Sequence, residues 1–140
     1  MKILHVSHTN ILSDSRILKE MIALSKSSLN FKLYGIGINN NEYINKENLN
    51  EYKKLNISNK TLAFINLKHN RGIVVLIEFY LKTFFHSKKI NPDIIHCHDF
   101  TSLPICYIMK FFFNSKLIYD AHELESMRNG VGKKYGFTIF

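Results

Sequence analysis

The feature that most constrains the fold of this chain is an alternation of short apolar runs with longer segments of helical spacing. Runs that are typical of buried strands occupy residues 2–7, 31–38, 61–67, 93–98 and 116–120. Apolar residues three and four positions apart indicate amphipathic helices after residue 14, over residues 73–86 and over residues 102–113. Strands that alternate with helices predict an α/β fold, namely a Rossmann-like, doubly wound parallel sheet with helices on both faces.

The remaining segments fit this pattern less directly. Either Ser13 or Asp14 is suited to cap the first helix, because both side chains accept hydrogen bonds from free backbone amides. Residues 39–60 are polar and rich in asparagine, so we expect them to leave the sheet, with a short helix near residues 47–55. Three glycines interrupt the pattern after Met127. We expect residues 1–140 to form a single domain that is incomplete at its C-terminal end.

The composition excludes several classes of protein. The chain has 140 residues, of which 46% are hydrophobic, and glycine and proline are scarce. Disordered, fibrous and low-complexity classes are therefore excluded. The formal net charge of +8 favours anionic partners such as phosphates, nucleic acid or an acidic membrane surface. No RNA-binding aromatic motif or helix-turn-helix spacing is visible, and we expect no nucleic-acid partner.

The distribution of cysteines and apolar segments predicts a soluble, cytoplasmic protein. Cys97 and Cys106 are too few to form a disulfide framework. His5 and His8 interrupt the apolar run at the N-terminus, so it does not resemble a signal peptide. The longest apolar stretches carry charged residues and are shorter than the roughly 20 residues that a membrane-spanning helix needs.

Polar side chains follow three of the predicted strands, where parallel sheets bind their ligands. The first group is Ser7, His8, Thr9 and Asn10, the second is His98 and Asp99, and the third is Asp120, His122 and Glu123. Their convergence at one edge of the sheet is the main functional signal in the sequence. The alternative for any single histidine is an ordinary hydrogen-bonded or solvent-facing side chain.

Three apparent motifs do not carry the chemistry that they suggest. Residues 35–40 lack the third glycine of a dinucleotide-binding fingerprint, and residues 130–134 lack essential parts of a phosphate loop. The sequence HCHD at residues 96–99 suggests zinc, and His96 and His98 do share one face of a strand. Zinc sites usually draw ligands from more than one segment, and Cys97 would point the other way. We therefore expect no metal site and no cofactor.

Two of the predicted helices combine aromatic and basic residues. Residues 73–89 end in Lys88 and Lys89, and residues 110–113 read KFFF. Such helices either pack into the core with solvated lysines or dock on an anionic membrane surface. Peripheral contact with the inner face of a membrane is therefore one of the partner interactions that the sequence suggests.

Three segments, in this order, resemble motifs of family-4 retaining glycosyltransferases with the GT-B fold. They are residues 2–20, with KILHVS and the pattern D-x-R-I-x-K-E; residues 92–104, with PDIIHCHD and LP; and residues 116–124, KLIYDAHEL. The resemblance covers residues 1 to about 126. It implies that this chain is the N-terminal, acceptor-side domain of a two-domain enzyme whose donor-binding domain is absent from these 140 residues.

The resemblance also implies roles for particular residues. His122 matches the histidine at the transfer centre, and His98 and Asp99 match a motif that lines the cleft between the domains. The loop after the first strand would approach the donor phosphates, although residues 7–11 lack the glycine-rich turn of many family members. The chain would then be part of a longer enzyme, a truncated gene product or half of a split enzyme.

We therefore expect transfer of a sugar from a nucleotide-sugar donor to a glycan or lipid-linked acceptor, without a metal, as in the synthesis of surface polysaccharides. The isolated domain is expected to be inactive. Two alternatives remain: a non-catalytic Rossmann-like binding module, and half of another GT-B enzyme such as a nucleotide-sugar epimerase.

Overall fold

A five-stranded parallel sheet forms the centre of the molecule, a computed structural model that describes residues 1–39, 60–68 and 72–121. Its strands lie in the order β3-β2-β1-β4-β5, and every neighbouring pair is parallel. The strands are β1 (Lys2–Val6), β2 (Lys32–Ile38), β3 (Lys60–Ile65), β4 (Ile94–Cys97) and β5 (Lys116–Tyr119). The predicted α/β fold with a Rossmann-like parallel sheet is confirmed.

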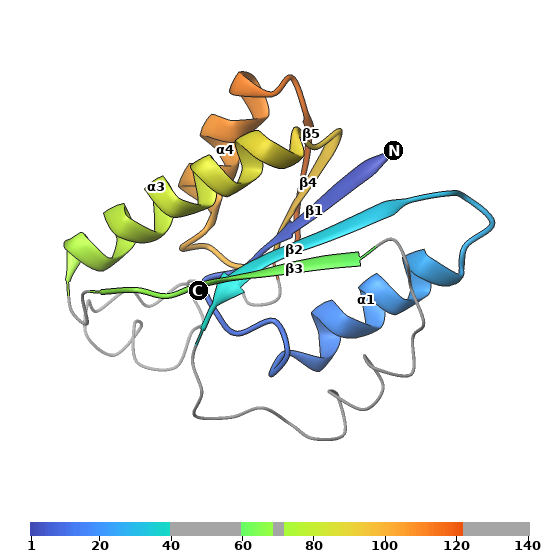
Figure 1. The fold of residues 1–140 in the computed structure, drawn as a ribbon, viewed down its shortest axis with the longest axis horizontal. Helices are drawn as coiled ribbons and strands as arrows, with labels where there is room; N and C mark the ends of the chain where they lie inside the picture. Colours follow the sequence, from blue (N-terminus) through green and yellow to red (C-terminus); the bar gives the residue numbers. More distant parts are fainter. Residues whose placement is uncertain (40–59, 69–71, 122–140) are drawn as a thin grey trace, which may run out of the picture.

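Helices cover both faces of this sheet (Figure 1). Helix α1 (Ser15–Lys26) packs on one face, where Ile17 and Met21 join a core cluster with Ile3. Helices α3 (Ile73–Ile90) and α4 (Leu103–Phe112) pack on the other, where the larger core cluster includes Phe79. Because side chains alternate along a strand, β1 contributes Ile3 and His5 to the α1 face and its intervening residues to the α3/α4 face.

Helix α1 begins where the sequence predicted. Asp14 is the N-cap, and its carboxylate accepts a hydrogen bond from the backbone N–H of Arg16 at 3.0 Å. This contact satisfies one of the amides that a helix leaves free at its first turn.

Helix α3 is one turn longer than the apolar spacing predicted. Its buried positions Phe79, Thr83 and Ser87 lie four residues apart, so the same face continues inward through small polar residues. The Ser87 hydroxyl donates to the carbonyl of Thr83 at 2.7 Å, which makes its burial inexpensive. The helix ends at Ile90, and the C-cap residue Asn91 has a left-handed φ of 50°.

Several large apolar side chains on α3 and α4 point away from the core. We call them the outer apolar surface: Ile73, Val74, Ile77, Leu81 and Phe85 on α3, and Tyr107, Ile108, Phe111 and Phe112 on α4, all exposed. Among the described helices, none is long and apolar enough to span a bilayer.

One glycine allows the loop after β1 to pack closely over β2. The backbone N–H of Ile38 donates to the carbonyl of Thr9 at 3.0 Å. A Cβ atom on Gly37 would lie 2.6 Å from that same carbonyl oxygen, too close for any larger residue without a backbone shift. Glycine at this position therefore fixes the loop at the carboxyl edge of the sheet.

Four of the sequence-based expectations fall outside the described residues. They are the short helix near residues 47–55, the form of the tail after Met127, and the two candidate site residues His122 and Glu123.

Candidate functional site

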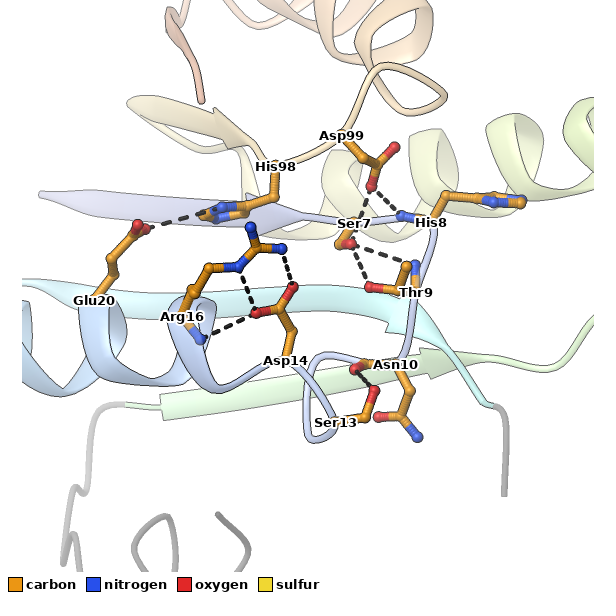
Figure 2. Close-up of polar contacts among 10 residues, drawn as sticks. All are labelled: Ser7, His8, Thr9, Asn10, Ser13, Asp14, Arg16, Glu20, His98 and Asp99. Carbon is orange, nitrogen blue, oxygen red and sulfur yellow. Dashed lines mark hydrogen bonds and ion pairs between the residues drawn. The ribbon is translucent and has the colours of Figure 1, made fainter. Parts of the chain in front are cut away.

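Asp99 joins the loop after β1 to the beginning of α4 (Figure 2). Its Oδ2 atom accepts from the backbone N–H of His8 at 2.6 Å and from the hydroxyl of Ser7 at 3.0 Å. Its Oδ1 atom accepts from the Thr101 hydroxyl at 2.6 Å, and from the N–H and hydroxyl of Ser102 at 2.7 and 2.8 Å. Both carboxylate oxygens are thus engaged within the protein.

These hydrogen bonds decide the charge of Asp99. Burial on its own would raise the pKa of the carboxyl group, but the donors from Thr101, His8 and Ser102 outweigh it and hold the pKa below 3.8. The group is therefore ionised at neutral pH. A charged acceptor makes stronger hydrogen bonds than a neutral one, so Asp99 fixes the relative position of two loops at this edge.

The loop after β1 has its own internal hydrogen bonds. The hydroxyls of Ser7 and Thr9 are 2.7 Å apart, and the Thr9 N–H donates to Ser7 Oγ at 3.3 Å. The Asn10 side-chain oxygen accepts from the N–H of Leu12 at 3.0 Å. Ser7 and Asn10 are buried, whereas Thr9 is exposed. Thr9 is thus the exposed polar side chain of this loop at the carboxyl edge.

His8 leans away from the loop toward α3. Its ring lies edge-on to Phe79, with the ring centroids 4.8 Å apart. Partial burial lowers the pKa of His8, and the negative charge of Asp99 only partly opposes this effect. Its buried Nε2 atom makes no hydrogen bond within the described part of the chain.

His98 lies away from this loop, on the α1 face of the sheet. Its Nε2 atom is 2.9 Å from Nδ1 of His5, and its Nδ1 atom is 3.9 Å from Oε2 of Glu20. Only 5% of the residue is exposed. The structure therefore separates the two neighbours that the sequence had grouped: Asp99 contacts the β1 loop, and His98 contacts two histidines and α1.

The histidines around His98 were not among the sequence-predicted site residues. His96 has Nδ1 at 3.6 Å from Glu20 Oε2, and its ring centroid is 4.2 Å from that of His98. His5 is fully buried; burial, and then the neighbouring His98 and His96, lower its pKa well below 6.5. The signal available in the sequence is the period of two, which places His96 and His98 on one face.

Asp120 is the described member of the third predicted group. Its backbone N–H donates to the Cys97 carbonyl at 2.9 Å, which extends the β4–β5 ladder to the carboxyl edge. Burial raises the pKa of Glu20, and a hydrogen bond and charge interaction with Asp120 raise it further. Asp120 thus interacts with α1 as well as with the strand ends.

The expectation that Cys97 points away from the histidines is confirmed, because Cys97 belongs to the core cluster under α3 and α4. The possible metal ligands nevertheless come from more than one segment. Within the described residues, the side chains able to hold a metal ion together are His5, Glu20, His96 and His98, which come from β1, α1 and β4.

Comparison with known proteins gives two similarities. Over 68 residues, the chain is 33% identical to the starch synthase 3, chloroplastic/amyloplastic, of Arabidopsis thaliana; the match covers 44% of this chain and 6% of that protein. The fold is similar to that of the UDP-GlcNAc 2-epimerase from Methanocaldococcus jannaschii, with a TM-score of 0.54, 13% identity, and coverage of 93% of this chain and 33% of that one. No protein-family model matches.

The matches thus span far less than two thirds of either similar protein. Both are enzymes by name, one a starch synthase and the other an epimerase of a nucleotide sugar. The resemblance to GT-B enzymes is supported at this coarse level, whereas membership of family 4 stays a prediction. The chain has a Rossmann-like α/β fold of the kind found in a nucleotide-sugar epimerase, and it shares a stretch of sequence with a starch synthase.

Proposed function

We propose that this chain is the acceptor-side, N-terminal domain of a GT-B glycosyltransferase that transfers a sugar from a nucleotide-sugar to a glycan or lipid-linked acceptor. The observation that carries the proposal is the loop after β1, which Asp99 and Gly37 hold at the carboxyl edge of a parallel sheet. Ligands of open parallel α/β sheets bind at this edge. The sequence similarity to a starch synthase supports the same class of chemistry.

The residues at this edge then take different roles. The exposed Thr9 contacts a substrate directly, together with His8, while Ser7 and Asn10 hold the loop in shape. Asp99 is a positioning residue, because its oxygens bind the loop itself. His98 and Asp120 act from the α1 side, through Glu20.

His122 is the proposed catalytic residue. It follows β5 in the sequence, as Glu123 does, and β5 ends beside β4 at the carboxyl edge. An imidazole there would donate a hydrogen bond to a sugar hydroxyl or a donor phosphate, in either its neutral or its protonated form. Glu123 would orient that ring. The transfer itself needs no metal or cofactor in this proposal.

A second Rossmann-like domain would hold most of the donor. The described edge offers hydroxyls, an imidazole and backbone amides, and its Asp99 carboxylate is occupied and negatively charged. We expect such an edge to contact a diphosphate without binding it tightly. The donor-binding domain is thus the partner that completes the enzyme.

A binding titration tests this division of labour. We expect the 140-residue chain alone to bind UDP-, ADP- and GDP-sugars no more tightly than about 1 mM, which corresponds to roughly −4 kcal/mol. Calorimetry or ligand-observed NMR would measure this. A micromolar dissociation constant for any of them would show that the chain binds a donor by itself, and the acceptor-side assignment would be lost.

An epimerase half is the second candidate function, and the fold similarity to the UDP-GlcNAc 2-epimerase favours it. The two functions differ in their need for an acceptor. When the chain is expressed with the polypeptide encoded downstream, a transferase moves the sugar to an added glycan. An epimerase converts the nucleotide-sugar with no acceptor present.

We also propose that the chain contacts an anionic membrane. The outer apolar surface is exposed, and Lys82, Lys88, Lys89 and Lys110 lie on the same two helices. Apolar and basic side chains together suit the interface of an anionic bilayer. A lipid-linked acceptor would be reached from such a surface.

A further inference from the structure

Four side chains from three separate elements converge on the α1 face of the sheet. His5 comes from β1, Glu20 from α1, and His96 and His98 from β4 and the residue after it. Each offers one ligand atom, and these four atoms all lie within 4.8 Å of one another. We call this set the His-Glu cluster. Figure 2 shows Glu20 reaching from α1 to the ring of His98.

The backbone places these residues together independently of side-chain rotamers. His5 and His96 are direct partners in the parallel ladder between β1 and β4. His96 and His98 are two residues apart, so they point to the same face. Glu20 lies one turn after Ile17 and Arg16 on a helix whose Ile17 and Leu18 are buried against the sheet. A cluster built on strands and a packed helix is held rigidly.

Hydrogen bonds within the protein do not account for the whole cluster. The Nε2 atom of His5 and the Oε2 atom of Glu20 are buried, and neither makes a hydrogen bond within the described part of the chain. Buried polar atoms without partners destabilise the fold. A cation bound at the cluster would give the Glu20 oxygen a partner, and it would compete with the hydrogen bond between His5 Nδ1 and His98 Nε2 for the ring lone pairs.

The separations are those of ligands around a small transition-metal ion. Zn²⁺ bonds to histidine nitrogen and carboxylate oxygen at about 2.0–2.2 Å, which places the ligands of a tetrahedral site a little over 3 Å apart. The measured separations from Glu20 Oε2 are 3.6 Å to His96 Nδ1 and 3.9 Å to His98 Nδ1. The largest separation within the set is up to 4.8 Å, so closing the site around one ion needs side-chain shifts of up to about 1 Å.

We propose that the His-Glu cluster binds one divalent transition-metal ion of the zinc type, with His5, Glu20, His96 and His98 as its protein ligands. Three imidazoles and one carboxylate favour Zn²⁺ and similar ions, whereas Mg²⁺ and Ca²⁺ prefer oxygen ligands. The ion would tie α1 to the two central strands, close to the edge where the β1 loop begins. This inference shares His98 and Glu20 with the proposed function, but it assigns the ion no part in sugar transfer, and its tests measure metal binding and not transfer.

The test uses the untagged chain after treatment with a chelator. We expect calorimetry with Zn²⁺ to give one ion per chain, with a dissociation constant of about 1 µM or tighter. Zn²⁺ should raise the melting temperature, and Mg²⁺ at the same concentration should not. Bound Co²⁺ should give the intense visible absorption of a four-coordinate site. The absence of saturable micromolar binding, or a weak octahedral-type Co²⁺ spectrum, would overturn the proposal.

Two variants connect the binding to the cluster. Glu20→Gln and His96→Gln change ligands that are partly exposed, so both variants should fold, as circular dichroism would verify. Each is expected to weaken Zn²⁺ binding at least about 100-fold, more than the loss of an outer-shell partner. His86→Gln, on an exposed position of α3, is the matched control and should bind as the wild type does. Unchanged affinity in both ligand variants would place the ion elsewhere and refute the site.

Discussion

At the scale of single residues, Asp99 shows how one carboxylate can set the shape of a loop edge. It accepts hydrogen bonds from donors in two segments, the loop after β1 and the beginning of α4. His8, in the first of these segments, lies 91 residues from Asp99 in the sequence. Because these donors hydrogen-bond to the Asp99 carboxylate, its charged form is stabilised in the folded state. Asp99 therefore contributes directly to the stability of the fold, and it contributes to function through the position of the loop after β1.

We predict that Asp99→Asn destabilises the fold. The amide has one oxygen in place of two and presents its NH₂ group to a donor, so several hydrogen bonds are lost. The expected loss is about 2–4 kcal/mol in the free energy of unfolding, measured by urea denaturation. Asp93→Asn is the control, because the Asp93 carboxylate is exposed and accepts from Lys2 N–H at 2.7 Å. An equal loss in the two variants would contradict the role given to Asp99.

His5 predicts a pH dependence of stability. The pKa of His5 in the folded state lies well below 6.5. Below pH 6.5, the unfolded chain therefore binds a proton at His5 that the folded chain does not bind. Stability should therefore be fully present above pH 6.5 and decrease as the pH falls below it, by at most about 1.4 kcal/mol per pH unit from this residue. Urea denaturation between pH 7 and 5, in the presence of a chelator, measures this slope. His5→Gln should flatten it, and an unchanged slope would exclude His5 as its source.

At the scale of elements, α3 and α4 divide their side chains between two environments. One face of each helix packs into the core cluster, with Phe79 from α3 and Met109 from α4. The outer apolar surface lies on the other faces, next to the lysines at the end of α3. The sequence interpretation of core packing therefore applies to one face of each helix, and docking on a membrane stays a proposal for the other face.

We predict that the chain binds anionic lipid vesicles through this surface. Binding should decrease with added salt, because exposed charges are screened over about 8 Å at physiological ionic strength. Lys88→Glu with Lys89→Glu should weaken co-sedimentation at least about tenfold. Lys19→Glu with Lys26→Glu reverses the same number of charges on α1, across the sheet, and should have a smaller effect. Equal binding to neutral vesicles would indicate non-specific hydrophobic contact instead.

At the scale of the whole molecule, the sequence was sufficient for the order and type of the elements in the described residues. A parallel strand that is buried on both faces is a short apolar run, and such runs are visible without any tertiary information. The end of α3 was missed because Ser87 is polar yet buried, a combination that requires knowledge of its hydrogen bond to the Thr83 carbonyl.

The arrangement of the site was less predictable. Carboxyl-edge residues could be named because the topology brings strand ends together, and Ser7, His8 and Asp99 do meet there. Neither the engagement of both Asp99 oxygens nor the meeting of His5 with Glu20 follows from local patterns. Both depend on which strands pair and in which register, and a local pattern contains no information on either.

The central claim is that this domain, once joined to a donor-binding domain, supports sugar transfer through its carboxyl edge. The most direct measurement is the turnover of a nucleotide-sugar with an acceptor by the chain expressed with its downstream polypeptide, compared with that of its His122→Ala variant. We expect transfer by the parent, and a fall of about two to four orders of magnitude in turnover with little change in melting temperature, because His122 acts on the transition state. No transfer by the parent to any acceptor, or near-normal turnover by a well-folded variant, would contradict the account.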